Sequence, residues 1–273
     1  MLIDCGEATQ ISLRKNKIKF QKINQIFISH LHGDHYLGLP GLVSTFNLFG
    51  RTKPLDIFGP SELKAIIELH FQVSGSVLNY KINFHTIETD SKKLIFENKI
   101  LSVYSIPLKH RIKTFGFVFE EKQKPRHIKS EMIKFYSIPH YEIKSIRNGK
   151  DYVDEEGNII LNKKLTNPAD PSYKFAYCSD TAYFPEILEW IKDADLLFHE
   201  ATFMDKHTEL AQKTLHSTTM QAADIAKQSN AKQLIIGHFS SRYIVSQELV
   251  DECKTIFNNT IEAYDGLNLM VNC

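Results

Sequence analysis

The stretch ISHLHGDHYLGLP, from Ile28 to Pro40, carries three histidines and one aspartate within six positions. Imidazole nitrogens and carboxylate oxygens both bind zinc, at about 2.0–2.2 Å. These four side chains could therefore hold one cation, or a short loop could share them between two cations. Two four-coordinate cations need about eight donor positions, so a two-cation site requires ligands from elsewhere in the chain. The candidates in this stretch are His30, His32, Asp34 and His35.

Three further donors follow apolar runs, as His30 does. His110 ends LSVYSIPLKH, Asp180 ends YKFAYCSD, and His238 ends AKQLIIGH. A lone histidine at a strand end is more often a hydrogen-bonded structural residue than a ligand. The repeated placement at the carboxyl ends of predicted strands nevertheless favours a shared metal site.

Short apolar runs predict the strands that would position these donors. We expect strands at 25–29, 55–58, 82–87, 101–106, 115–120, 173–178, 195–198, 233–236 and 267–271. Residues 31–36, with Gly33 inside them, would form a tight loop. Helices are expected at 61–71, which Ser61 could cap, at 216–230, where Thr218 and Gln221 could form a capping box, and at 246–257. This mixture indicates an α/β fold of sheets covered by helices.

The composition is that of an ordinary soluble globular protein. The 273 residues are 42% hydrophobic and 24% charged, and no apolar run is long enough for a membrane helix. We see no signal-peptide pattern. The four cysteines form no C-x-x-C pair, which favours a reducing, cytoplasmic location over a disulfide framework.

Positive charge is concentrated in one part of the chain. Residues 109–150 contain eleven Lys or Arg and four Glu, a net +7, whereas the whole chain carries +1. Residues 121–172 hold four prolines and show little periodicity. We therefore expect a single domain, 1–273, with a basic arm inserted at about 121–172. The arm could contact a polyanion, although a solvated lysine-rich loop is the simpler alternative. Its candidate contact residues are Lys122, Lys124, Arg126, Lys129, Lys144 and Arg147.

The donor pattern resembles that of the metallo-β-lactamase superfamily, and within it the ribonuclease Z family in its short bacterial form. The narrower resemblance rests on LIDCGEATQ, HGDHYLGLPGL, CSDT, HEATF, HSTTMQAA and HFSSRY, which span nearly the whole chain. It implies an α/β fold, a metallo-β-lactamase-type αββα sandwich with the metals at one edge. Family members normally carry further N-terminal strands before LIDCGE, so we expect either that the start was mis-assigned or that this chain lacks these strands at the edge of one sheet. His140 and Tyr141 stand where relatives often have Gly-Pro in the arm.

The resemblance also implies two zinc ions per chain and a role for each donor. His30, His32 and His110 would bind the first zinc, while Asp34, His35 and His238 would bind the second. Asp180 would bridge both ions, and Asp34 would also orient the attacking water as general base. Asp4 of DCGE would brace the metal-binding loop through hydrogen bonds.

The implied activity is that of a zinc-dependent endoribonuclease that removes the 3′ trailer from precursor tRNA. The tRNA would keep a 3′-hydroxyl and the trailer a 5′-phosphate. The arm would hold the tRNA elbow, and short members of the family act as homodimers. Because breaking the P–O3′ bond requires a proton at the leaving oxygen, we expect His216 of HST to donate it. Glu200 of HEAT would orient His216 within hydrogen-bonding reach.

Three alternatives remain open. A general di-zinc phosphodiesterase would keep the metal ligands without preferring folded RNA. A diiron oxidoreductase of the same fold would normally replace one donor with glutamate, and HLHGDH contains none. An N-terminally truncated chain could be inactive.

Overall fold

The computed structural model describes residues 1–271, which divide into two compact units. The first comprises residues 1–96, 103–119 and 174–271. The second comprises residues 97–102 and 120–173. Within the described residues, no helix has the length and apolar character needed to span a membrane.

One sheet of the first unit has four parallel strands in the order β1-β2-β3-β4. They are β1 (Leu2–Ile3), β2 (Gln25–Phe27), β3 (Leu55–Gly59) and β4 (Ile82–Thr86). Helices α1 (Thr9–Lys15), α3 (Leu39–Leu48) and α4 (Glu62–Val73) share its core. Leu42 of α3 and Ile67 of α4 pack into the same buried cluster as Ile57 of β3, so these helices cover one face of the sheet.

The larger sheet has seven strands in the order β15-β14-β13-β12-β7-β6-β5. They are β5 (Lys93–Glu97), β6 (Leu101–Leu108), β7 (Thr114–Glu121), β12 (Lys174–Cys178), β13 (Leu196–Glu200), β14 (Leu234–Gly237) and β15 (Thr260–Glu262). Helices α10 (Thr219–Gln228) and α11 (Gln247–Lys254) pack on it through a second buried cluster. Its connections contain η2 (Pro185–Ile187), α8 (Leu188–Ile191), η3 (Asp205–His207) and α9 (Thr208–Thr214), and η1 (Phe20–Lys22) precedes β2.

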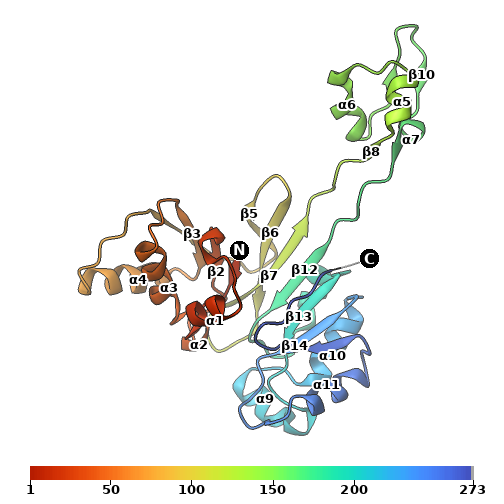
Figure 1. Cartoon of the computed structure of the whole chain (residues 1–273). Helices are drawn as coiled ribbons and strands as arrows, with labels where there is room; N and C mark the ends of the chain where they lie inside the picture. The colour runs from red at the N-terminus through yellow and green to blue at the C-terminus, as the bar shows by residue number, and fades with distance from the viewer. Residues whose placement is uncertain (272–273) are drawn as a thin grey trace. The chain divides into compact units, whose positions relative to one another are not determined.

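The two sheets pack face to face through aromatic side chains. The ring of Phe27 in β2 lies 5.5 Å from that of Phe117 and 5.6 Å from that of Phe119, both in β7. Helices α3 and α4 lie outside one sheet, and α10 and α11 lie outside the other (Figure 1). The expected α/β sandwich of the αββα type is confirmed.

Several local predictions need correction. Residues 267–271 form no strand, and β15 occupies the sheet edge beside β14 instead. The apolar residues of 267–271 misled us because Met270 is 82% exposed and does not enter the core. Residues 31–36 are not wholly a loop, because Gly33–Tyr36 forms one helical turn, α2. The hydroxyl of Ser61 donates to the Glu62 carboxylate rather than capping α4.

The capping box at the start of α10 is confirmed. Thr218 accepts a hydrogen bond from the backbone of Gln221, and the Gln221 side chain accepts one from the backbone of Thr218. Two backbone N–H groups that lack a partner within the helix are thereby satisfied. The box fixes where the helix begins, immediately after the HST stretch.

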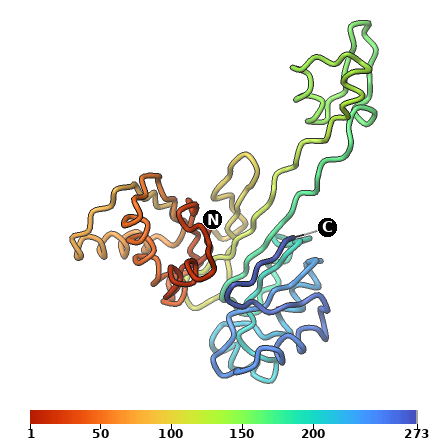
Figure 2. Tube along the Cα trace, viewed as in Figure 1, coloured from red at the N-terminus to blue at the C-terminus, as the bar shows by residue number. Residues whose placement is uncertain are grey.

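The second unit contains the segment expected to form the arm. Two extended stretches lead to a small head, where β8 (His127–Ile128) pairs antiparallel with β11 (Thr166–Asn167) (Figure 2). The head holds α5 (Ser130–Phe135), α6 (His140–Arg147), α7 (Asn162–Leu165) and the β9 (Tyr152–Val153)–β10 (Ile159–Ile160) hairpin. Its buried cluster consists of Ile138, Ile146, Tyr152, Ile160 and Leu165. These short helices were not expected from the sequence.

Candidate metal centre and active site

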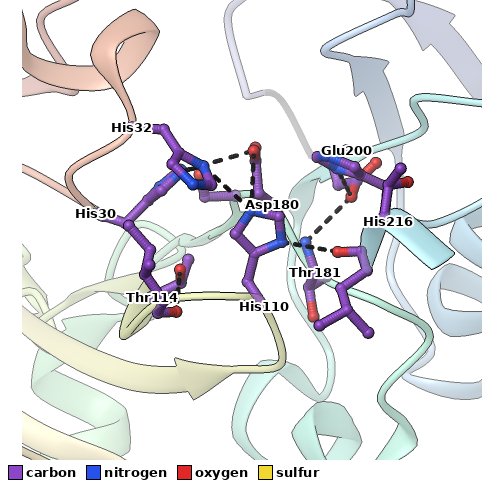
Figure 3. A network of polar contacts seen from close by, with 12 residues as sticks. His30, His32, His110, Thr114, Asp180, Thr181, Glu200 and His216 are labelled. Carbon is purple, nitrogen blue, oxygen red and sulfur yellow. Dashed lines mark hydrogen bonds and ion pairs between the residues drawn. The ribbon is translucent and has the colours of Figure 1, made fainter. Parts of the chain in front are cut away.

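The first group of donors gathers beyond the carboxyl ends of β2, β6 and β12, which precede His30, His110 and Asp180 (Figure 3). His32 Nδ1 lies 3.1 Å from His30 Nε2 and 3.2 Å from His110 Nε2. Asp180 Oδ2 lies 3.6 Å from His30 Nε2 and 3.8 Å from His110 Nε2. Three imidazole nitrogens and one carboxylate oxygen thus point toward one another.

The second group gathers around the other oxygen of Asp180. Oδ1 lies 3.5 Å from His35 Nε2 and 3.3 Å from His238 Nε2. Asp34 Oδ2 lies 3.4 Å from each of these two nitrogens. Each oxygen of one carboxylate therefore faces a different group of donors, which is the geometry that a bridging ligand requires.

The helical turn α2 explains how one short stretch serves both groups. His32 precedes α2 in an extended conformation, with φ −72° and ψ 146°. The chain then turns at Gly33, so Asp34 and His35 leave the backbone in a different direction from His30 and His32. The four donors are consequently divided between the two groups.

The donor set fits divalent cations of the kind that bind nitrogen and oxygen. His35 Nε2 and Asp180 Oδ1 are buried and have no hydrogen-bond partner. Leaving such atoms unsatisfied is costly unless another ligand satisfies them. Tetrahedral zinc accepts this mixture of imidazole and carboxylate donors.

The second nitrogen of four of these rings is held by the protein. His110 Nδ1 donates to the Leu215 carbonyl at 2.8 Å, which leaves its Nε2 free of a proton. His35 Nδ1 lies 2.8 Å from Asp4 Oδ2, His30 Nδ1 lies 3.0 Å from Ser29 Oγ, and His238 Nδ1 lies 3.0 Å from Thr202 Oγ1. Contacts of this kind orient imidazole ligands and select their tautomer.

Asp4 braces the histidine-rich stretch, as the resemblance implied. Its carboxylate accepts hydrogen bonds from the Ser29 backbone at 2.7 Å, the Ser29 hydroxyl at 2.9 Å and the Tyr177 hydroxyl at 3.1 Å. The backbone at Gly6 packs closely against the backbone of Asp34, because a Cβ added to Gly6 would lie 2.1 Å from the Asp34 carbonyl oxygen. A glycine at this position therefore allows DCGE to pack against α2.

Three residues at the site have left-handed backbone conformations. Asp4, Leu215 and His238 have φ values of 53°, 57° and 61°, in the left-handed region that side chains other than glycine rarely adopt. Each of these residues either contributes a donor or holds one. The surrounding hydrogen bonds stabilise conformations that would otherwise be costly.

Glu200 and His216 form a hydrogen-bonded pair beside the two donor groups. His216 Nδ1 lies 2.8 Å from Glu200 Oε1, which is the contact expected from the sequence. In Figure 3 this pair lies on the opposite side of Asp180 from His30 and His32. His216 also has a ring nitrogen in a cluster with Asp180 and His238, whose potential ligand atoms all lie within 4.8 Å of one another.

The Glu200 carboxylate is fully buried and receives several donors. The backbone N–H groups of Thr181 and Ser217 donate to Oε1, at 3.1 and 3.0 Å. The backbone and hydroxyl of Thr202 donate to Oε2, at 2.9 and 2.8 Å. Burial alone would raise the pKa of Glu200, but the hydrogen bond from His216 and the surrounding positive partners lower it below its ordinary value. Glu200 is consequently an anion at neutral pH.

Burial tunes the ligands as well. Burial and, to a lesser extent, the neighbouring histidines lower the pKa of His30 to about 2, so this ring is neutral and able to bind a cation. Burial raises the pKa of Asp180. A cation between the donor groups would offset that desolvation.

The structure thus brings together all seven predicted ligands, Glu200 and His216. The basic residues of the arm lie in the second unit and make local contacts there. Lys124, Arg126 and Arg147 line one pocket of about 120 Å³ together with Asn148 and Gly149. The contacts of the arm cations are Lys122 with Glu97, Lys124 with Glu121, Arg126 with Thr166, Lys129 with the Lys164 carbonyl, and Arg147 with the Arg126 carbonyl. Lys144 lies in α6.

Sequence reasoning missed Thr202. Its hydroxyl lies between Glu200 Oε2 and His238 Nδ1, so it joins the carboxylate–histidine pair to a metal-ligand candidate. The only available signal was its place two residues after Glu200 in HEAT.

Comparison with known proteins gives consistent matches over most of the chain. The family described as Anti-Pycsar protein Apyc1 matches residues 1–247. A ribonuclease Z of Bacteroides thetaiotaomicron is 48% identical over 99% of this chain and 86% of that protein. A ribonuclease Z of Bacteroides fragilis is 47% identical over 97% of this chain and 88% of that protein. The crystal structure of human tRNase Z, short form, aligns with a TM-score of 0.70 and 26% identity, over 99% of this chain and 88% of that one.

Proposed function

Since the chain belongs to the ribonuclease Z family, we propose that it is a zinc-dependent endoribonuclease that removes the 3′ trailer from precursor tRNA. The chain also belongs to the family described as Anti-Pycsar protein Apyc1. The tRNA keeps a 3′-hydroxyl and the trailer a 5′-phosphate. The observation that carries this proposal is the pair of donor groups on the two oxygens of Asp180, with the Glu200–His216 pair beside them.

Two zinc ions per chain match the number of donor groups. His30, His32 and His110 would hold one ion, Asp34, His35 and His238 would hold the other, and Asp180 would contribute an oxygen to each. When bound, two such cations supply Lewis-acid chemistry, activating water and neutralising the charge of a phosphodiester. The protein residues around them orient the reactants.

Asp34 orients the attacking water and takes up its proton. Its carboxylate is 61% exposed, whereas that of Asp180 is 4% exposed, so Asp34 remains accessible to water and substrate. In the metal-free chain the hydrogen bond from His238 lowers the pKa of Asp34, so this carboxylate is ionised and able to bind a cation.

His216 supplies the proton on the leaving side. Its Nδ1 is bonded to Glu200, so Nε2 is the ring nitrogen available to the substrate. The oxygen released from phosphorus is the 3′-oxygen of the tRNA, and a general acid there avoids formation of an alkoxide. Glu200 fixes the tautomer and orientation of the ring that this transfer requires.

The arm contributes affinity for the tRNA backbone. Lys124, Arg126 and Arg147 place three cations around one pocket, which suits a phosphate group. Lys122, Lys129 and Lys144 extend the positive charge of the same unit. Contacts of this kind recognise the shape of an RNA rather than its sequence, as an enzyme that accepts many tRNAs needs.

The chain acts as a cytoplasmic homodimer. An exposed apolar surface on the first unit supports self-association, because Leu48, Val73 and Val77 are 85%, 80% and 81% exposed. Leu48 at the end of α3 lies beside Asn47, whose side chain donates to the Val77 carbonyl at 3.0 Å, so Leu48 and Val77 lie in one region. Sedimentation of the purified chain gives its mass in solution.

The proposal is tested by cleavage of a precursor tRNA beside an unstructured RNA of equal length and bis-p-nitrophenyl phosphate. Zinc content is measured on the same sample. We expect one cut in the precursor, after the nucleotide that precedes the trailer, with a 3′-hydroxyl on the tRNA. Equal turnover of both RNAs at scattered positions would support a general phosphodiesterase instead.

A further inference from the structure

A small pocket lies beside His216 in the first unit. It has a volume of about 200 Å³, and its lining combines metal-ligand candidates, the candidate proton donor and side chains without a role so far. The lining residues are His32, His110, Arg111, Thr202, Phe203, Thr214 and His216. A space of this volume holds several water molecules, so it can admit a polar group such as a sugar.

The ligands that line this pocket come from one donor group only. His32 and His110 belong to the first group, while Asp34, His35 and His238 of the second do not line it. The ring centroid of His216 is 4.9 Å from that of His110. A group in the pocket would therefore contact His216 on the side of the first donor group.

The direction of cleavage decides which part of the substrate lies there. His216 protonates the 3′-oxygen that leaves phosphorus, and that oxygen belongs to the last nucleotide of the tRNA. The ribose that carries the oxygen must lie next to His216. The chain of this nucleotide then continues through its own 5′-phosphate toward the acceptor stem.

Arg111 stands at the rim of the pocket. Its side chain is exposed, and one guanidinium nitrogen lies 3.4 Å from the Lys213 carbonyl oxygen, a long contact that leaves the other donors of the fork available. No carboxylate lines the pocket to compete for this cation. An arginine fork matches the oxygens of a phosphate in geometry as well as in charge.

We propose that this pocket binds the nucleoside whose 3′-oxygen is released, and that Arg111 binds the phosphate on its 5′ side. The proposal rests on the proposed function and adds a position-specific contact to it. Arg111 thereby fixes the register of cleavage, because it locates the nucleotide immediately before the scissile bond.

The test combines a protein change with a change of one substrate phosphate. Wild type and Arg111→Ala each cleave a normal precursor and a precursor with a neutral methylphosphonate at the predicted contact. With wild type we expect the neutral linkage to lower kcat/KM by about 10- to 100-fold, as for loss of a charged hydrogen bond. On the normal precursor, kcat/KM of Arg111→Ala should be about 10- to 100-fold below that of wild type. On the modified precursor, Arg111→Ala and wild type should have the same kcat/KM.

Two controls make the result specific. A methylphosphonate placed one linkage further into the stem should leave the effect of Arg111→Ala intact. Lys113→Ala removes an exposed cation two residues away that does not line the pocket, and it should cleave both precursors as wild type does. The proposal would be overturned if the losses in kcat/KM from Arg111→Ala and from the methylphosphonate were additive. It would also be overturned if Arg111→Ala cleaved the normal precursor as wild type does. Failure of wild type to cut the normal precursor would instead overturn the proposed function.

Discussion

Replacing Thr202 with Val tests whether one buried hydroxyl joins the carboxylate–histidine pair to the metal centre. Valine keeps the shape of the side chain and removes only its hydrogen-bonding oxygen. Thr202 is 6% exposed, so water has little access to replace it. The change breaks the 2.8 Å bond to Glu200 Oε2 and leaves His238 Nδ1, at 3.0 Å, without an acceptor.

The expected loss follows from these two contacts. A hydrogen bond to a charged group contributes about 1.5–3 kcal/mol, and an unsatisfied donor costs about 1–3 kcal/mol. Glu200 Oε2 still accepts a hydrogen bond from the Thr202 backbone N–H at 2.9 Å, so the cost at Glu200 is near the lower limit. His238 is 28% exposed, so water can partly satisfy its Nδ1 and the cost there is also near the lower limit. We expect about 2–3 kcal/mol less free energy of unfolding in the metal-free chain. Loss of ligand orientation should weaken zinc binding by about 10- to 100-fold.

Urea denaturation of the metal-free chain measures the free energy of unfolding, and competition with a chelator measures the zinc affinity. Thr202→Ser restores the hydroxyl and should recover most of both losses. Zinc affinity equal to that of wild type in Thr202→Val would show that the hydroxyl does not position His238. An equal defect in Thr202→Ser would attribute the loss to packing of the methyl group.

Three further predictions follow from the same site and from the arm. Asp180→Ala removes an oxygen from both donor groups, so it should lower bound zinc and abolish turnover. Activity surviving rigorous chelation in wild type would contradict the metal requirement. Deleting 122–150 should weaken precursor binding and flatten its salt dependence while hydrolysis of bis-p-nitrophenyl phosphate persists. An equal loss of activity on both substrates would indicate that the arm has a structural role instead. Because Glu200 has a lowered pKa in the fold, its stabilising contribution is present above its unfolded pKa of about 4.5 and is lost as the pH falls through the folded value. Glu200→Gln should therefore flatten the acid side of the stability profile, and unchanged acid unfolding would refute this.

The metal-ligand candidates could be found from sequence because their placement is local. His30, His110 and His238 each follow a short apolar strand, so each can be recognised as a donor at the carboxyl end of a strand without knowing how the sheets pack. The capping box of α10 was equally visible, since Thr218 and Gln221 are three residues apart. Signals within one element do not depend on how the elements are packed.

Contacts between distant elements could not be found in this way. Thr202 has its role only because β13 and β14 are neighbours, which places its hydroxyl beside His238. Tyr177 reaches Asp4 across 173 residues of sequence. The helices of the arm were missed because their stability depends on a small cluster around Ile146 and Leu165 rather than on a long amphipathic pattern.

The central claim is that this centre cuts precursor tRNA with His216 as proton donor. It is tested most directly by comparing His216→Ala with wild type on precursor tRNA and on bis-p-nitrophenyl phosphate, at equal zinc content. Since a p-nitrophenolate leaves without a proton, we expect a loss of about 10²–10⁴-fold on the precursor and a far smaller loss on the nitrophenyl ester. Zinc content and precursor affinity should match those of wild type. Equal losses on the two substrates would contradict the account.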